Sequence, residues 1–135
     1  MSCVWWCDER GGPTVEFALL LPVLILILFG TIEFGLAFYS QEVLTNASRE
    51  GARAGIVQNT PKPSVSDIQT VVNNYLTGTG INPSLVTVTV VGAGGTFPNP
   101  LTVTVTYNYQ FLVLPRFSGV PSSINLTAQT VMRHE

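Results

Sequence analysis

Apolar positions dominate the first third of the chain. From Val15 to Ile32 nearly every residue is apolar, and no charged residue occurs between Phe17 and Ile32. At about 1.5 Å per residue, Val15 to Ile32 would form a helix roughly 27 Å long, close to the ~30 Å hydrocarbon core of a bilayer. The pattern predicts one membrane-spanning helix, which tolerates Pro22 because membrane helices accommodate proline by local adjustment.

The helix is expected to continue beyond the membrane to about Gly55, before the Asn59-Thr60-Pro61-Lys62-Pro63 segment breaks it. Small residues let another backbone approach a helix closely. Those along this helix are Gly30, Ala47, Gly51, Ala54 and Gly55. The last four recur at i, i+4, i+7 and i+8 and form one narrow stripe. Two partners remain open for the stripe: a helix of another subunit, or the chain's own C-terminal domain.

A second, shorter helix is predicted after the proline-rich break. Ser64, followed three residues later by Asp67, resembles a capping box with Asp in place of Glu. Apolar residues then recur at helical spacing before Gly78 and Gly80. They are Val65, Ile68, Val71, Val72, Tyr75 and Leu76.

Strict alternation of apolar and polar residues takes over in the last third. Val86 to Val90, Leu101 to Phe111 and Ile124 to Ala128 each follow a period of two, with threonine at many polar positions. These segments predict a three-stranded antiparallel sheet with one face in water and the short helix packed on the other. The edge of the long Leu101 to Phe111 strand is a candidate partner contact, since an unpaired edge is a template for another strand; a simple solvated threonine surface is the alternative.

The predicted fold class is therefore α+β: a long N-terminal transmembrane helix followed by a small domain of one short helix on three strands. The expected divisions are a leader at 1–11, a transmembrane and stalk helix at 12–58, and an α+β domain at 59–135. The 135 residues are enough for one such domain.

Composition narrows the possible functions. Charged residues make up 10% of the chain and its net charge is −2, which suits an exported or surface domain and excludes a basic nucleic-acid footprint. Cys3 and Cys7 both lie in the leader, so a disulfide scaffold is not expected. The single histidine, His134, lies beside the last residue, and no carboxylate pair, activated nucleophile or metal-ligand cluster is evident. We expect no enzyme, no cofactor and no metal site.

A cleavable secretory signal is the alternative interpretation of the apolar segment. Such a signal has a positive n-region, whereas Asp8 and Glu9 outweigh Arg10 here. No small-x-small cleavage site follows the apolar run; the next residues are Thr31-Ile32-Glu33-Phe34-Gly35. These features favour a retained anchor.

Two carboxylates flank the predicted span. Glu16 lies at its N-terminal end and Glu33 just beyond its C-terminal end. The simplest interpretation is that both are interfacial charges that bracket the membrane, where the penalty is smaller than at the bilayer centre.

The N-terminal motifs resemble those of the TadE-like family, minor pseudopilin-like proteins of the tight-adherence (Flp) pilus system. The resemblance covers about a third of the chain, from Gly11 to Gly55. The matching residues are Arg10-Gly11, Val15-Glu16-Phe17-Ala18-Leu19-Leu20-Leu21-Pro22-Val23-Leu24, Phe29-Gly30-Thr31-Ile32-Glu33-Phe34-Gly35 and Ala47-Ser48-Arg49-Glu50-Gly51-Ala52-Arg53-Ala54-Gly55. A weaker similarity runs from Ile124 to Arg133.

The resemblance implies a pilin-like fold and a precursor cut by a prepilin peptidase between Gly11 and Gly12. Glu16 would then be the fifth mature residue, followed by Phe17, and could pair with the new α-amino group. It further implies a single-pass subunit of the bacterial inner membrane with a cytoplasmic N-terminus and a periplasmic domain, or a component of an extracellular pilus. Its partners would be other pilin-like subunits, inner-membrane assembly proteins and the lipid bilayer, in adhesion and biofilm formation.

The alternative function is a permanently anchored periplasmic binding or scaffold domain. A site carried on loops, around Thr96-Phe97-Pro98 or Phe117-Ser118-Gly119, would be its sign. A third possibility, a secreted soluble protein, requires a mature product that lacks Val15 to Ile32.

Overall fold

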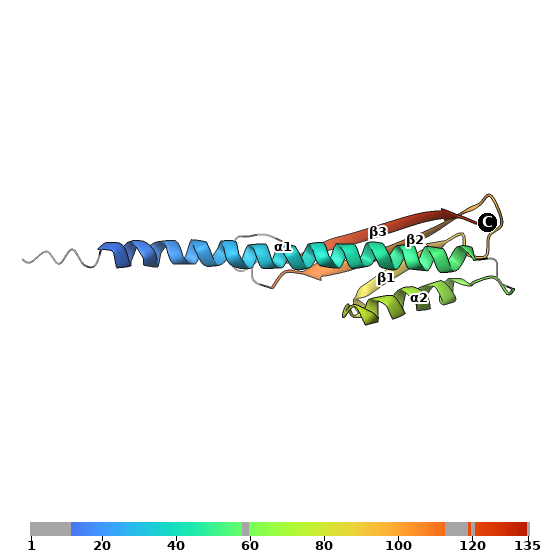
Figure 1. Cartoon of the computed structure of the whole chain (residues 1–135), viewed down its shortest axis with the longest axis horizontal. Coiled ribbons are helices and arrows are strands. Elements are labelled where there is room, and N and C mark those ends of the chain that lie inside the picture. The colour runs from blue at the N-terminus through green and yellow to red at the C-terminus, as the bar shows by residue number, and fades with distance from the viewer. Residues whose placement is uncertain (1–11, 58–59, 113–118, 120, 135) are drawn as a thin grey trace, which may run out of the picture.

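The computed structural model describes residues 12–57, 60–112, 119 and 121–134. Its helices are α1 (Gly12–Ile56), α2 (Val65–Gly78) and the short 3₁₀ helix η2 (Pro83–Leu85). Its strands are β1 (Val86–Val91), β2 (Pro100–Gln110) and β3 (Ser123–Arg133). The α+β class is confirmed, with one long helix, one short helix and a three-stranded antiparallel sheet (Figure 1).

β2 is the central strand, because the strands are joined in sequence and lie in the order β1-β2-β3. It pairs with β3 along its whole length, from Pro100 opposite Arg133 to Gln110 opposite Ser123. It pairs with β1 from Thr102 to Tyr107. The expectation of an unpaired long edge on this strand is therefore wrong; the outer edges of the sheet belong to β1 and β3. A period of two predicts a strand and its faces but does not predict which strand lies in the middle.

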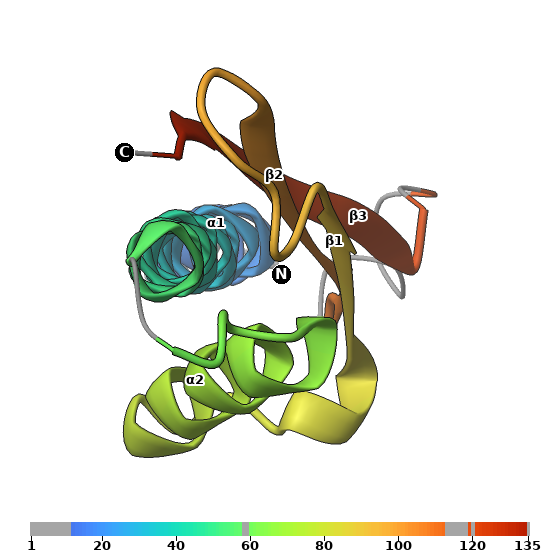
Figure 2. The same cartoon turned by 90° about the vertical axis from the view of Figure 1, so that its right-hand side faces the viewer.

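Both helices cover the same face of the sheet (Figure 2). The alternation along β2 decides which face this is: Leu101, Val103 and Val105 are fully buried, while the threonines between them are partly exposed. α1 contributes Leu44 and Ala47 to the same core, and α2 contributes Ile68, Val72 and Leu76. Burying each of the larger aliphatic side chains stabilises the fold by roughly 1.5–3 kcal/mol. The C-terminal half of α1 is thus part of the hydrophobic core.

The predicted capping box at the start of α2 is confirmed. The Ser64 side chain accepts the amide N–H of Asp67, and the Asp67 carboxylate accepts the Ser64 amide N–H at 2.9 Å and its hydroxyl at 2.7 Å. These hydrogen bonds hold the pKa of Asp67 below its ordinary 3.8, and the bond from the Ser64 hydroxyl contributes more than the bond from the Ser64 amide. The carboxylate form therefore stabilises the fold above the unfolded-state pKa, and this stabilisation is lost as pH falls through the lower folded-state pKa.

Ser64→Ala is expected to lower the free energy of unfolding by about 1 kcal/mol at neutral pH, because the first turn of α2 loses its capping hydroxyl. The difference from wild type should shrink in strong acid, where Asp67 is protonated in both proteins. Denaturant unfolding followed by circular dichroism checks this at both pH values. Thr77→Ala, which removes another exposed hydroxyl of α2 that bonds only the Asn73 carbonyl, is the control and should be nearly neutral. An equal loss in the two variants would contradict the capping role.

Candidate membrane and assembly surface

The N-terminal half of α1 extends away from the domain (Figure 1). From Gly12 to Ile32 every side chain is exposed or partly exposed, and the most apolar window of the helix is 0% buried. By length and composition α1 can cross a membrane, and it is the one helix of the described chain that can. A bilayer would cover the large apolar side chains that the domain leaves exposed.

The expected processing motif lies at the beginning of this exposed half. Gly12 is the first residue of α1, and Pro13 follows in the first turn, where its missing N–H has no intrahelical partner to lose. Glu16 and Phe17 are both exposed, Phe17 at 60%. Gly11, the other half of the expected cleavage site, lies outside the described residues, as does the rest of the 1–11 leader.

Within the described structure, the stripe of small residues contacts the chain's own domain. Ala47, Gly51 and Gly55 are buried, and Ala54 is partly exposed. A Cβ placed on Gly51 would lie 2.5 Å from Cγ2 of Val72, and one placed on Gly55 would meet Leu101 and Ile68. Glycine is thus what lets α1 approach α2 and β2 closely.

Gly30 lies apart from this packed stripe. It sits in the N-terminal half of α1 and is partly exposed. Contacts of Gly30 with another subunit remain a prediction.

Glu33 marks the point where α1 first meets the domain. It is 5% exposed, and its Oε1 accepts the amide N–H of Leu112 at 2.7 Å. The Tyr109 hydroxyl makes a longer contact, 3.5 Å, with the Glu33 main-chain carbonyl oxygen. Burial, and secondarily the charge of Glu33, raises the pKa of Tyr109 above its ordinary 10.0, so this hydroxyl stays protonated at neutral pH.

Aromatic rings surround this junction. Phe34 packs edge-on against Phe111 with ring centroids 5.9 Å apart, and Tyr109 packs likewise against Phe111 at 5.4 Å. Tyr107 continues the series along β2, 6.2 Å from Tyr109. These rings and the Glu33 hydrogen bond fix α1 to the end of the sheet that lies nearer the exposed half of the helix.

The burial of Glu33 differs from the expectation of a simple interfacial charge. The sequence contained a signal for this burial, because Glu33 precedes Ala47 by fourteen residues, or two heptads, and so lies on the same face of the helix. The buried positions of α1 follow this stripe from one end to the other: Glu33, Ala37, Ser40, Val43, Leu44, Ala47, Ser48, Gly51, Ala52 and Gly55.

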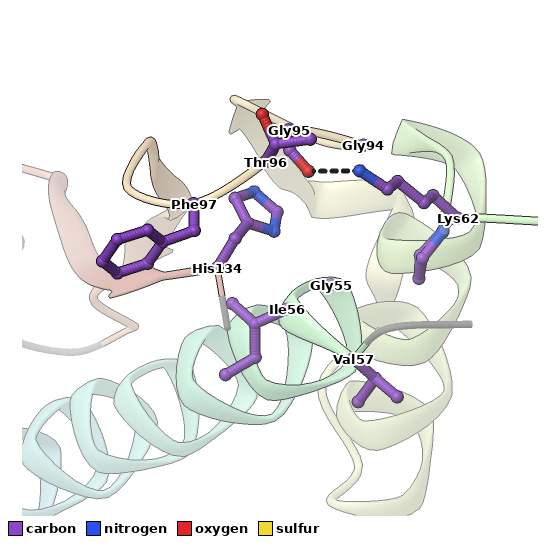
Figure 3. A pocket seen from close by; sticks show the side chains of 10 residues that line it. Gly55, Ile56, Val57, Lys62, Gly94, Gly95, Thr96, Phe97 and His134 are labelled. Atoms are coloured by element: carbon purple, nitrogen blue, oxygen red, sulfur yellow. Dashed lines mark hydrogen bonds between the residues drawn. The ribbon is translucent and has the colours of Figure 1, made fainter. Parts of the chain in front are cut away.

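A pocket of about 400 Å³ lies at the opposite end of the domain (Figure 3). Thr96 and Phe97, from one of the two loops considered for a binding site, contribute to its wall together with Lys62 and His134. Lys62 Nζ donates to the Gly95 carbonyl oxygen at 2.9 Å, and His134 Nε2 lies 2.9 Å from the Gly92 carbonyl oxygen, as an N–H donor would. Both side chains therefore hold the β1–β2 loop. Of the second loop considered, Phe117 and Ser118 lie outside the described residues.

In the part of the chain that the structure describes, no three His, Cys, Asp or Glu side chains are grouped so that they could hold a metal ion. Cys3 and Cys7 lie outside that part.

Comparison with known proteins adds one positive finding. The model of the family described as TadE-like protein matches residues 11–53, about a third of the chain. The match includes the expected cleavage site, the exposed half of α1 and the first part of its packed half. Searches of curated proteins and of solved structures each found no match.

Proposed function

From the TadE-like match over residues 11–53, which implies involvement in the Tad pilus system, we propose that this chain is a minor pilin-like subunit that takes part in pilus assembly. The pilus would be a tight-adherence type IV pilus used for surface attachment and biofilm formation. The subunit works by packing, not by catalysis. α1 holds it in the membrane, and the sheet domain faces the periplasm.

The observation that carries the proposal is the division of α1 into two halves. Residues 12–32 are exposed, whereas the half that begins at Glu33 is built into the domain core. The exposed half is available to lipid in the free subunit and to neighbouring apolar helices in an assembly. Glu16 lies at the exposed end, where a charge against apolar surroundings needs a partner.

The proposed partners are those that the resemblance to the TadE-like family implies. A prepilin peptidase of the inner membrane would cut between Gly11 and Gly12, and the new α-amino group would compensate Glu16 within one subunit or between two. Other pilin-like subunits and inner-membrane assembly proteins would contact the apolar half of α1. The N-terminus would be cytoplasmic.

A permanently anchored binding or scaffold domain is the second candidate function. The membrane-distal pocket favours it, because Lys62 and His134 supply positive or hydrogen-bonding groups beside apolar walls from Ile56, Val57 and Phe97. This candidate requires no cleavage and no contact between subunits. Neighbouring genes for a prepilin peptidase, a secretion ATPase and TadC-like membrane proteins would favour assembly over this alternative.

The intact mass and N-terminal sequence of the protein from a membrane fraction test the proposal. We expect a mature chain that begins at Gly12. Gly11→Val should block the cut, because a branched side chain replaces glycine beside the scissile bond, and the uncut precursor should accumulate. Thr14→Val, which places the same valine side chain after the cut without adding bulk beside the scissile bond, should be processed normally.

A wild-type chain that retains Met1 would favour the anchored domain over the pilin-like subunit. A start beyond Gly35 would remove the membrane helix and contradict both candidates. An unchanged mature mass in Gly11→Val would contradict the assigned cleavage site.

A further inference from the structure

Exposed apolar side chains continue beyond the predicted membrane span. Phe34, Leu36, Phe38 and Tyr39 of α1 are each half or more exposed, and Leu112, just after β2, is 81% exposed. We propose that these five residues form an interfacial collar that seats the membrane-proximal end of the sheet domain in the headgroup layer of the bilayer. This inference rests on the proposed membrane anchoring and adds a second lipid contact, made by the domain itself.

The length of α1 fits this placement. Gly12 to Ile32 spans about 31 Å at 1.5 Å per residue, which matches the ~30 Å hydrocarbon core. At the same rise Phe34 to Tyr39 lie about 3–10 Å beyond Ile32, where the headgroup region of one leaflet, half of the difference between the ~40–45 Å bilayer and its ~30 Å core, is about 5–7 Å thick. The collar therefore falls at the depth where aromatic side chains are enriched in membrane proteins.

The distribution of charge along α1 also fits a collar in the headgroup layer. Between Glu16 and Glu42 the only charged residue is Glu33. Its carboxylate is buried against the domain and accepts the Leu112 amide. The same hydrogen bond fixes the main chain of Leu112 to α1 while the Leu112 side chain remains exposed. The domain thus shields the one charge that α1 carries between Glu16 and Glu42 and presents an apolar side chain beside it.

The directions of the collar side chains favour lipid over a second protein chain. At 100° per residue, Phe34, Phe38, Tyr39 and Leu36 are spread over roughly 200° of the helix circumference. The remaining sector holds Glu33, Ala37 and Ser40, which are buried against the domain. A partner helix would cover one side of α1, whereas lipid covers every side that the domain leaves open.

Depth-dependent fluorescence quenching tests the collar in the full chain. Cys3 and Cys7 are replaced by serine, and one cysteine is placed at Leu112, at Val91 or at Leu24 and labelled with an environment-sensitive fluorophore. Val91 is the matched control, an aliphatic residue 62% exposed at the membrane-distal end of β1. Leu24 lies inside the predicted span. The protein is reconstituted at high lipid-to-protein ratio in phosphatidylcholine–phosphatidylglycerol vesicles.

We expect lipids that carry a nitroxide at headgroup depth to quench the Leu112 label several-fold more than the Val91 label. Aqueous iodide should show the reverse order. The Leu24 label should respond to a nitroxide placed deep in the acyl chain.

Each other outcome overturns the collar. If iodide quenches the Leu112 label as strongly as the Val91 label while the Leu24 label still responds to the deep nitroxide, the anchor is intact but the domain lies clear of the membrane. A Leu112 label shielded from both quenchers shows that protein, not lipid, covers this site. A Leu24 label that lipid does not quench removes the anchor, and the proposed function with it.

Discussion

Glu16→Val is expected to leave the protein in the membrane and to reduce piliation about tenfold or more. Removing a charge from the end of an apolar helix favours insertion, so the protein should remain in the membrane fraction. Assembly should fail because the α-amino group of Gly12 would lose its compensating carboxylate among apolar helices. A tenfold loss corresponds to about 1.4 kcal/mol of association free energy. Pili counted per cell by electron microscopy, with immunoblots of membrane fractions, give both readouts.

Thr14→Val is the control for this experiment, since it places the same side chain two residues away without removing a charge. It should assemble like wild type. Normal piliation in Glu16→Val would remove the role assigned to Glu16. Loss of the variant from the membrane fraction would instead show that Glu16 acts in insertion or stability.

Gly51→Leu is expected to destabilise the domain by about 3 kcal/mol, the upper part of the range for overpacked cores. A Cβ at position 51 would lie 2.5 Å from Cγ2 of Val72 and 3.5 Å from Ile68 and Val103. Val72 cannot turn aside easily, because it is fully buried and β-branched side chains are stiff at χ1. Denaturant unfolding of the detergent-solubilised full chain measures the loss.

Gly78→Leu is the matched control, because Gly78 ends α2 and a Cβ there meets nothing within 4 Å. Leucine has the better helix propensity, so this variant should be at least as stable as wild type. If the stripe served only contacts between subunits, Gly51→Leu would unfold like wild type and fail only in assembly. That result would contradict the packing of α1 on its own domain.

Local signals in the sequence predicted most of the elements. The nearly continuous apolar run predicted the exposed half of α1, the Ser64–Asp67 pair predicted the start of α2, and the period of two predicted all three strands. Each of these features is determined by residues near one another in the chain. The match to the TadE-like family covers residues 11–53, which contain the apolar run but neither the start of α2 nor the strands.

Contacts between distant segments were harder to predict. The hydrogen bond from the Leu112 amide to Glu33 joins residues 79 positions apart, and neither sequence neighbourhood contains a signal for the other. His134 looked unimportant beside the chain end, yet it is 6% exposed and holds Gly92 in the β1–β2 loop. The stripe of small residues predicted close packing but left its partner open, since glycine permits the approach of any backbone.

The continuity of α1 has a mechanical consequence. The helix runs for 45 residues, about 67 Å, through Pro22 and Gly35 without leaving the helical conformation, and its last turns are clamped in the domain core. The exposed half of α1 and the half built into the domain core therefore move together as one rigid body. If the N-terminal half lies in a bilayer, a tilt of that half by a few degrees would move the loops at the far end of the domain sideways by several ångströms, so forces on the N-terminal half would set the orientation of the domain.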